Sequence, residues 1–252
     1  DYCNSASEIY PTVFPNNCGQ NPRNCYFRKT ERSNQENECD LMGLIIEMTD
    51  KEIRLENRYL MLDKTLILSD LHLGKTLHFR KAGLAIPAAA RDADQSELIR
   101  ILLMEKPETV LVLGDLFHSA SNRECEELAM ITSQFPSIHF ELIMGNHDIL
   151  SPEVYRSMDF ETSSNRSMGN ILLTHEPILD LDPKIINIHG HIHPGIRLVG
   201  LGRQSMLVPC FFWTKQSFCL PAFGALTGLM RQKPKKADKA YGILEGEVSQ
   251  VF

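Results

Sequence analysis

Five short polar segments combine six of the chain's nine histidines with aspartate and asparagine, and side chains of these types can bind a metal ion or move a proton. Each segment follows an apolar run typical of a β-strand, such as Leu66-Ile67-Leu68. The segments are Ser69-Asp70-Leu71-His72, Gly114-Asp115, Gly145-Asn146-His147-Asp148, Thr174-His175-Glu176 and His189-Gly190-His191-Ile192-His193. Proteins that alternate strands and helices place functional side chains on loops beyond strand ends. We therefore expect the five segments to converge on one site.

The residue types in these segments indicate a dinuclear metal centre. Aspartate and asparagine oxygens combined with histidine nitrogens suit manganese, iron or zinc better than calcium or magnesium. Cysteine is absent from all five segments, which argues against structural zinc. Each motif alone is also compatible with an ordinary turn, but turn formation does not explain all five in this order. The predicted ligands are Asp70, His72, Asp115, Asn146, His175, His191 and His193.

Strands and helices that would position these loops are expected in alternation. Apolar and alternating patterns predict strands within 47–68 and at 109–113, 138–144, 171–173, 185–188, 197–199, 206–208 and 217–220. Helical spacing predicts helices at 87–105, with Pro87 in the first turn, and at 121–134, with Ser121 as the cap. Gly114, Gly145 and Gly190 are expected to let the backbone turn sharply after a strand. The whole pattern predicts a layered α/β domain.

Three regions of different composition divide the chain. Residues 1–41 are rich in Asn, Ser, Gln, Pro and Cys without regular periodicity, and we expect a disordered or non-native leader there. Their four cysteines leave open a small metal or disulfide module, although the spacings match no metal-binding pattern. Residues 42–230 are expected to form the domain that carries the site, and residues 231–252 a basic, exposed C-terminal tail and final segment.

The composition sets limits on partners and location. Of 252 residues, 43% are hydrophobic and 23% are charged, and the net charge of −6 argues against a scaffold that holds nucleic acid by charge alone. An enzyme that meets nucleic acid at one local site stays compatible with this charge, because bound divalent metals supply positive charge there. The chain has no apolar stretch of membrane-spanning length, and its first residues do not resemble a secretory signal. We therefore expect a cytoplasmic protein whose seven cysteines are free thiols.

The order of the five motifs resembles that of the calcineurin-like metallophosphoesterases. These enzymes carry Asp-x-His, Gly-Asp, Gly-Asn-His-Asp, a single His and Gly-His-x-His in this order, and every ligand position is matched here. The resemblance implies two mixed β-sheets flanked by helices, with the metal site at the strand-end loops. It also implies two ligand sets joined at the bridging Asp115, which are Asp70, His72, Asp115 and His193, and Asp115, Asn146, His175 and His191.

The same resemblance implies roles for two residues that are not ligands. His147 would be the catalytic histidine, which protonates the leaving oxygen or stabilises its charge. Asp148 would orient His147, since a carboxylate beside an imidazole fixes its tautomer. Two divalent metal ions would clamp the phosphoryl oxygens and lower the pKa of a bridging water. Manganese is the favoured ion, with iron or zinc as alternatives.

A longer stretch, over residues 55–230, resembles the bacterial DNA ligase-associated metallophosphoesterases of the PdeM type. The resemblance rests on Ser69-Asp70-Leu71-His72-Leu73-Gly74-Lys75 and on the segments 78–84, 114–118, 190–197, 207–211 and 220–225. This resemblance implies a DNA endonuclease or phosphodiesterase in DNA damage repair, in functional association with a DNA ligase and a helicase. Residues 1–41 have no counterpart in it.

Four further residues are candidates for substrate binding. Lys75, His78 and Arg80 follow the first ligand loop and are candidate contacts for a substrate phosphate, although a solvated basic turn is equally compatible with them. His118 is a candidate either for lining the same pocket or for supporting Asp115. His189 precedes two ligands, and we expect a structural role for it.

Two alternatives stay open beside a phosphodiesterase. A phosphomonoesterase or nucleotide pyrophosphatase would use the same fold and ligands, and the ratio of monoester to diester rates would distinguish them. A non-catalytic protein-binding module would be expected to lack ligands or the catalytic histidine, and all of these are present here. The sequence carries no signal for an oligomeric state.

Overall fold

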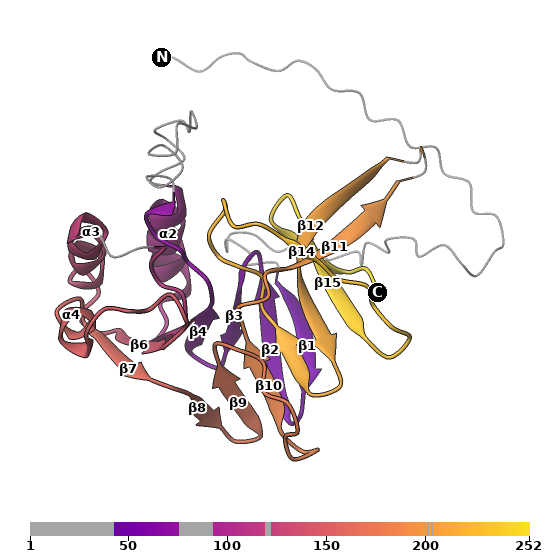
Figure 1. The fold of residues 1–252 in the computed structure, drawn as a ribbon, viewed down its shortest axis with the longest axis horizontal. Coiled ribbons are helices and arrows are strands. Elements are labelled where there is room, and N and C mark those ends of the chain that lie inside the picture. Colours follow the sequence, from indigo (N-terminus) through magenta and orange to yellow (C-terminus); the bar gives the residue numbers. More distant parts are fainter. Residues whose placement is uncertain (1–42, 76–92, 119–121, 201, 203) are drawn as a thin grey trace, which may run out of the picture. The chain divides into compact units, whose positions relative to one another are not determined.

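Two β-sheets and the helices that cover one of them make up the described part of the chain (Figure 1). The computed structural model describes residues 43–75, 93–118, 122–200, 202 and 204–252. The expected leader at 1–41, the expected helix start at Pro87 and the expected cap Ser121 lie outside these residues, as do His78 and Arg80.

The first sheet contains seven described strands in sequential order. They are β1 (Leu44–Met48), β2 (Lys51–Glu56), β3 (Tyr59–Leu62), β4 (Thr65–Leu68), β5 (Thr109–Leu113), β6 (His139–Ile143) and β7 (Phe160–Ser163). β1 to β4 are antiparallel neighbours, whereas β4 to β7 run parallel. β4 is buried throughout, as expected for a parallel-sheet strand covered on both faces. The carboxyl ends of β4, β5 and β6 therefore meet at one edge.

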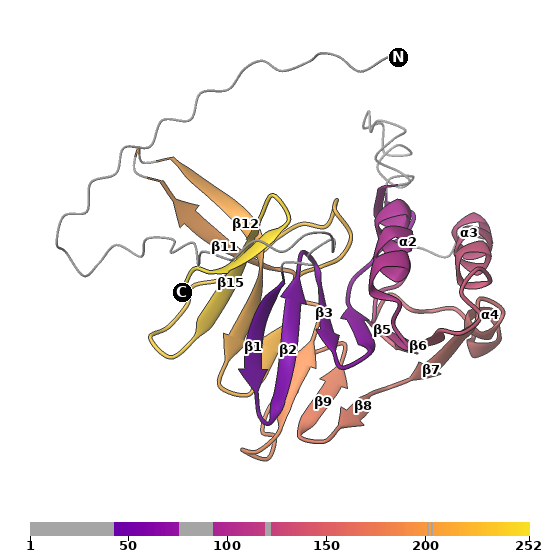
Figure 2. The ribbon, with the colours of Figure 1, turned by 180° about the vertical axis from the view of Figure 1, so that it is seen from behind.

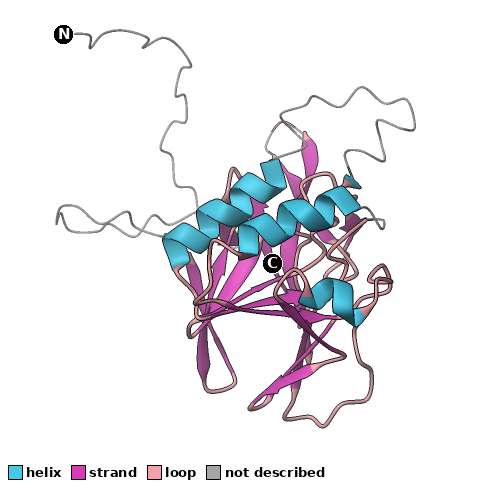
Figure 3. Ribbon diagram, turned by 90° about the vertical axis from the view of Figure 1, so that its left-hand side faces the viewer, coloured by secondary structure: helices cyan, strands magenta, loops and turns pink. Residues whose placement is uncertain are grey.

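The described helices pack on the outer face of the first sheet (Figure 3). They are α2 (Ala93–Glu105), α3 (Asn122–Thr132) and α4 (Pro152–Arg156). Leu98 and Ile101 of α2 and Leu128 of α3 belong to one buried cluster with Val110 and Phe140 of the sheet, so the predicted helical periodicity does face the core. Among the described helices, none is long and apolar enough to cross a membrane.

The second sheet holds the remaining described strands (Figure 2). They are β8 (Arg166–Met168), β9 (Ile171–Thr174), β10 (Ile186–His189), β11 (Pro194–Val199), β12 (Ser205–Thr214), β13 (Ser217–Cys219), β14 (Met230–Arg231), β15 (Lys239–Leu244) and β16 (Glu247–Gln250). Their order is β14-β11-β12-β13-β10-β9-β8, with β15 paired to β12 and β16 to β15. β9 and β10 are parallel neighbours, so the two strands that precede the later histidine ligands end side by side.

The two sheets pack against each other through a second apolar cluster. It joins side chains of the first sheet to side chains of the second, among them Leu60, Ile67, Leu111, Leu173, Ile188, Phe211 and Phe218. All of these side chains are fully shielded from solvent. The expected architecture of two mixed sheets flanked by helices is confirmed, with the described helices on the first sheet.

Several elements lie where the sequence pattern did not predict them. α4, β7 and β8 have five residues or fewer, which is too short for a periodic signal. Residues 231–252, expected as a tail and final segment, contain β15 and β16, and the expected boundary at residue 230 falls at β14 of the same sheet. β15 escaped the pattern because residues 240–243 are all buried and do not alternate. The basic part of this region is mostly exposed, as expected.

Candidate metal centre

The loops that follow β4, β5, β6, β9 and β10 come together where the two sheets meet. The Asp70 amide donates to the Gly114 carbonyl over 3.1 Å, which joins the first two loops. The Gly190 amide donates to the His175 carbonyl over 3.0 Å, which joins the last two. The His175 ring reaches across to the first sheet, where Nδ1 lies 2.9 Å from the Leu113 carbonyl. The structure therefore brings all seven predicted ligand residues to one place.

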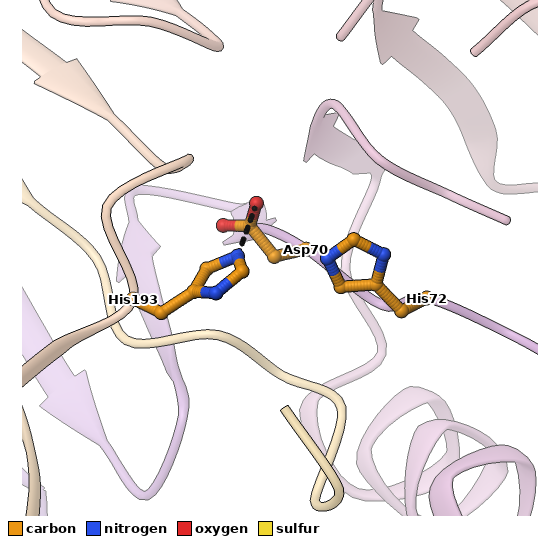
Figure 4. A group of neighbouring side chains, drawn as sticks. All are labelled: Asp70, His72 and His193. Carbon is orange, nitrogen blue, oxygen red and sulfur yellow. Dashed lines mark ion pairs between the residues drawn. The ribbon is translucent and has the colours of Figure 1, made fainter. Parts of the chain in front are cut away.

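Asp70, His72 and His193 form the first group of candidate ligands (Figure 4). Their ligand atoms lie within 4.8 Å of one another, and His193 Nε2 is 3.1 Å from Asp70 Oδ1. Both ring nitrogens of His72 are buried and have no hydrogen-bond partner among the described residues. Buried polar atoms rarely lack partners. A cation between these three side chains would satisfy them.

Asp115, His175 and His191 form the second group, and Asn146 joins it. A carbonyl oxygen can only accept, so the Leu113 contact places the ring proton of neutral His175 on Nδ1 and leaves Nε2 as a lone pair. That Nε2 lies 3.0 Å from Asn146 Oδ1 and 3.1 Å from His191 Nδ1. Acceptor atoms that converge in this way fit a bound cation better than a hydrogen-bonded cluster.

Asp115 lies between the two groups with one oxygen toward each. Its Oδ2 is 3.7 Å from His72 Nε2, and its Oδ1 is 3.4 Å from His175 Nε2. Asp115 is 2% exposed and Asp70 is 0% exposed. Two buried carboxylates carry a desolvation cost that cations would offset. Buried oxygens, orphaned nitrogens and the position of Asp115 together fit two divalent metal ions.

The backbone at the ligands adopts a conformation that side chains disfavour. Five ligands have left-handed φ values, which are 53° at Asp70, 46° at His72, 54° at Asp115, 67° at His191 and 51° at His193. Such strain persists only where the surroundings impose it, and it concentrates at functional sites. The expected sharp turn is therefore made largely by the ligand residues themselves.

The three glycines that precede ligands serve two different purposes. Gly114 has a φ of 75°, as the expected sharp turn requires. Gly145 and Gly190 are not in the left-handed region, so a positive φ is not the reason for glycine at these two positions. They are needed for space, because an added Cβ would lie 2.5 Å from Asp115 Oδ1 at Gly145 and 2.5 Å from Asp70 Oδ2 at Gly190.

Backbone amides donate hydrogen bonds to the ligand carboxylates, and no sequence motif predicts which amides do so. The His191 amide donates to Asp70 Oδ2 over 3.0 Å, and the His147 amide donates to Asp115 Oδ1 over 3.0 Å. The segment after β13 supports the first ligand loop, since the Phe223 amide donates to the Ser69 carbonyl over 2.8 Å. Every residue carries such an amide, so only the folded chain reveals which ones are used.

Asp148 contacts different groups from those expected. Its Oδ2 accepts from the amides of Asp115 and Gly145, both over 2.8 Å, and its Oδ1 accepts from the Leu116 amide over 2.9 Å. Burial raises the pKa of Asp148, and these three amides oppose that rise. Within the described residues no hydrogen bond links Asp148 to the His147 ring, so the carboxylate ties the second and third ligand loops together.

The other predicted site residues that are described lie around the first group. The exposed His147 ring is 5.4 Å from the His72 ring and 6.1 Å from the His118 ring, measured between centroids. Half-buried Lys75 lines a pocket with His72 and Thr227. Burial lowers the pKa of Lys75, although the nearby carboxylates of the site raise it in part. These three residues stay candidates for contacts with substrate.

Electrostatics keeps His72 in the form that binds metal. Burial lowers the pKa of His72 to about 3, and the charge of Lys75 contributes to the shift. A metal ligand must present an unprotonated nitrogen. His72 is therefore ready to bind a cation throughout the neutral pH range.

His189 has both ring nitrogens bonded within the protein. Nδ1 donates to the Gly190 carbonyl over 2.9 Å, so Nε2 accepts from the Ser217 hydroxyl over 2.8 Å. The side chain is 2% exposed, and burial lowers its pKa to about 4. Neither nitrogen is available for a metal, which supports a structural role.

A pH-dependent loss of stability follows from buried His189. Its pKa is about 4 in the folded chain against an ordinary value of 6.5, so the unfolded chain binds more protons and stability falls as the pH falls through this window. We expect the metal-free wild type to lose about 2 kcal/mol more than His189→Asn between pH 7 and pH 4.5. Urea unfolding at both pH values in a chelating buffer measures the difference. Identical pH dependence in the two proteins would contradict the assignment.

Comparisons with known proteins agree with this geometry. A family model described as calcineurin-like phosphoesterase matches residues 64–211, more than half of the chain. The crystal structure of Pseudomonas putida nuclease MPE aligns with 83% of this chain and 100% of its own at 24% sequence identity and a TM-score of 0.69, which shows a shared fold.

Two further solved structures are less similar. A protein of unknown function, AQ665 from Aquifex aeolicus, aligns over 51% of this chain and 78% of its own, with 22% identity and a TM-score of 0.38. Yfce, a phosphoesterase from E. coli, aligns over 74% of this chain and 97% of its own, with 12% identity and a TM-score of 0.38. None of the curated proteins matches the chain.

Proposed function

The chain belongs to the calcineurin-like phosphoesterase family, and from this premise we propose that it is a dinuclear-metal-dependent phosphodiesterase that cleaves DNA. Members of the family are hydrolases of phosphoric esters and bind two divalent metals, so the enzyme class and the general cofactor follow from membership. The position of Asp115 supports the proposal most strongly. Asp115 directs one oxygen to each of two groups of candidate ligands, as a bridging ligand would.

Each group of candidate ligands would hold one ion. One set is Asp70, His72, Asp115 and His193, and the other is Asp115, Asn146, His175 and His191. Bound there, the ions would supply positive charge to the phosphoryl oxygens and a water molecule of lowered pKa. Asp70 and Asp115 offset part of the metal charge. The Leu113 carbonyl fixes the His175 tautomer and keeps its Nε2 turned toward the site.

His147 is the best candidate for protonating the leaving oxygen. Its ring is exposed beside the His72 ring, so it can reach a substrate on the open side of the first group. A protonated His147 would give its proton to the alkoxide as the phosphorus–oxygen bond breaks, and the product would leave as an alcohol. Lys75 and His118 lie close enough to assist with the charge of the phosphate.

Manganese and DNA are the more specific parts of the proposal. The ligand chemistry favours manganese, with iron or zinc as alternatives. The motifs of the ligase-associated type and the nuclease among the solved structures of this fold both motivate a polynucleotide substrate. We propose a role in DNA damage repair, in the cytoplasm, alongside a DNA ligase and a helicase.

A panel of phosphoesters tests the proposal. With manganese, the purified protein should hydrolyse bis-p-nitrophenyl phosphate and a single-stranded DNA oligonucleotide, and it should hydrolyse p-nitrophenyl phosphate at least about tenfold more slowly. Faster monoester turnover would identify a phosphomonoesterase, and selective cleavage of nucleoside triphosphates would identify a pyrophosphatase. Absence of metal-dependent turnover on every ester would favour a binding module. Each of these three results would overturn the phosphodiesterase assignment.

A further inference from the structure

A basic segment, residues 231–239, begins beside the candidate metal centre. It carries five basic side chains and one acidic side chain, in a chain whose net charge is −6. All five basic residues are exposed, and they are Arg231, Lys233, Lys235, Lys236 and Lys239. So dense a cluster in an acidic chain indicates a local surface for an anionic partner.

The start of this segment is attached to the main chain of a predicted ligand. The Met230 amide donates to the His193 carbonyl over 2.9 Å, and the Gln232 amide donates to the Gly195 carbonyl over 2.7 Å. β14 thereby pairs in parallel with β11, with Arg231 opposite Gly195. The first cation of the segment is thus two strand positions beyond His193, which places the start of the basic segment close to the metal centre.

The rest of the segment has a defined course. The Lys235 amide donates to Asp238 Oδ2 over 2.7 Å, and the Asp238 amide donates back to the Lys235 carbonyl over 2.9 Å. The only acidic side chain is therefore used to close a turn. The segment then enters β15, where Lys239 Nζ lies 4.6 Å from the centroid of the Trp213 ring. Both ends are held in one sheet, because β14 pairs with β11, β15 pairs with β12, and β11 and β12 pair with each other (Figure 1).

The neighbouring sheet face adds a cation and apolar side chains. Arg231 is opposite Gly195 in the register, and Arg197 is two residues further along the same strand, so Arg231 and Arg197 lie on one face. Leu207, the register partner of Arg197, is on this face and 39% exposed. Val199, two residues beyond Arg197, is 69% exposed. Cations beside exposed apolar side chains suit a chain of phosphates and bases.

From this arrangement we propose that the basic segment and the Arg197–Arg231 face bind the phosphate backbone of a polynucleotide substrate on one side of the metal centre. The inference rests on the proposed function, because a polymer whose ester bond lies at the centre must extend past it on either side. An anionic lipid surface offers similar charge. A cation row attached to the main chain of a metal ligand matches a polymer that enters the site better than a flat membrane.

Neutralising the segment tests this surface. In the variant Lys233→Gln/Lys235→Gln/Lys236→Gln, the affinity for a labelled phosphorothioate DNA oligonucleotide, which keeps the backbone charge, should fall at least about tenfold in the manganese-loaded protein. The slope of log affinity against log salt should become shallower by about 2, at about 0.7 per phosphate contact on a single strand. The kcat/KM for an unmodified oligonucleotide, relative to that for bis-p-nitrophenyl phosphate, should fall in parallel.

A matched control removes three exposed lysines at the opposite ends of the strands. Lys64, Lys106 and Lys184 precede β4, β5 and β10, whose carboxyl ends point toward the ligand loops. The variant Lys64→Gln/Lys106→Gln/Lys184→Gln changes the net charge equally and should keep the wild-type oligonucleotide affinity and salt slope. Equal losses in the two triple variants would show that overall charge is responsible and would overturn the proposal.

Two other results bear on the proposal in opposite ways. Segment-dependent binding to phosphatidylserine vesicles, with unaltered oligonucleotide affinity in the first triple variant, would reassign the segment to membranes and overturn the proposal. Segment-dependent oligonucleotide binding by a protein that hydrolyses no phosphodiester would support the surface and refute the proposed catalytic function. The binding assay and the small-ester assay therefore separate the two failures.

Discussion

Replacing Asp115 with asparagine is expected to lower manganese-dependent hydrolysis of bis-p-nitrophenyl phosphate by about a thousandfold, equivalent to about 4 kcal/mol of transition-state stabilisation. The substitution keeps the shape of the side chain and tolerates the left-handed backbone, with φ of 54°, but it removes the charge shared by the two ligand groups. Because one Asp115 oxygen faces each group, we expect the affinity for both ions to fall. Steady-state rates and metal titration measure the two effects.

The same substitution is expected to leave the metal-free protein no less stable than the wild type. Asp115 is 2% exposed, and a buried carboxylate without a cation lowers the stability of the folded state. An asparagine oxygen can still accept the His147 amide that Asp115 Oδ1 accepts now. Manganese should raise the Tm of the wild type by about 5 °C or more, and that of Asp115→Asn by much less. Thermal unfolding with and without chelator provides the comparison.

Asp63 offers a matched control for Asp115. It has the same left-handed φ of 54°, its side chain is 70% exposed, and it lies in the turn before β4, at the end of that strand away from the ligand loops. Asp63→Asn should therefore keep wild-type rates and the wild-type response to manganese. If Asp115→Asn unfolds at a lower temperature than the wild type even in chelator, Asp115 is mainly structural and the bridging role fails.

The ligand set could be predicted from the sequence because its signals are local. Each ligand follows an apolar run directly, as Asp70 follows Leu68 after one residue, and the parallel strands then bring those ends to one edge. Histidines at 191 and 193 add an unusual residue type at a recognisable spacing. Strand ends and residue types together were enough to bring seven side chains into one predicted site.

What could not be predicted depends on contacts between distant segments. The amide donors to Asp70 and Asp115 leave no trace in residue type, and neither does the support that Phe223 gives to the first ligand loop. Gly145 and Gly190 signalled flexibility, whereas the folded site needs only their small size. The sequence pattern did not predict β15, because this strand is buried on both faces and its apolar and polar residues do not alternate. Tertiary packing decided each of these features.

Asp148→Asn is expected to weaken manganese binding by about 10- to 100-fold and to lower turnover with it. The carboxylate accepts three backbone amides, from Asp115, Leu116 and Gly145, and so joins the loop of one ligand to the loop of another. Asparagine offers one oxygen and an amino group, so at least one of these amides would lose its acceptor. We expect an accompanying loss of about 1–3 kcal/mol in the free energy of unfolding.

A double-mutant cycle with His147→Ala distinguishes this role from the orientation of His147. If Asp148 acts on the ligand loops, Asp148→Asn should weaken manganese binding equally in the wild type and in His147→Ala. If Asp148 acts only through His147, Asp148→Asn should cause no further loss of activity in the His147→Ala background. Manganese affinity should then stay near the wild-type value in both backgrounds. His139→Ala serves as the control, because His139 is exposed at the start of β6, away from the ligand loops.

A measurement of manganese affinity distinguishes these two roles, whereas a measurement of the hydrolysis rate does not. Either role predicts slow hydrolysis, since a misplaced His147 and a misplaced ligand loop both reduce turnover. Only the loop role changes metal affinity when the catalytic histidine is absent. We expect that change because Asp148 accepts the amides of Asp115 and Leu116 in one ligand loop and of Gly145 in the next, and makes no hydrogen bond to the His147 ring within the described chain. The Asp in this motif would then act by holding two ligands at their working separation.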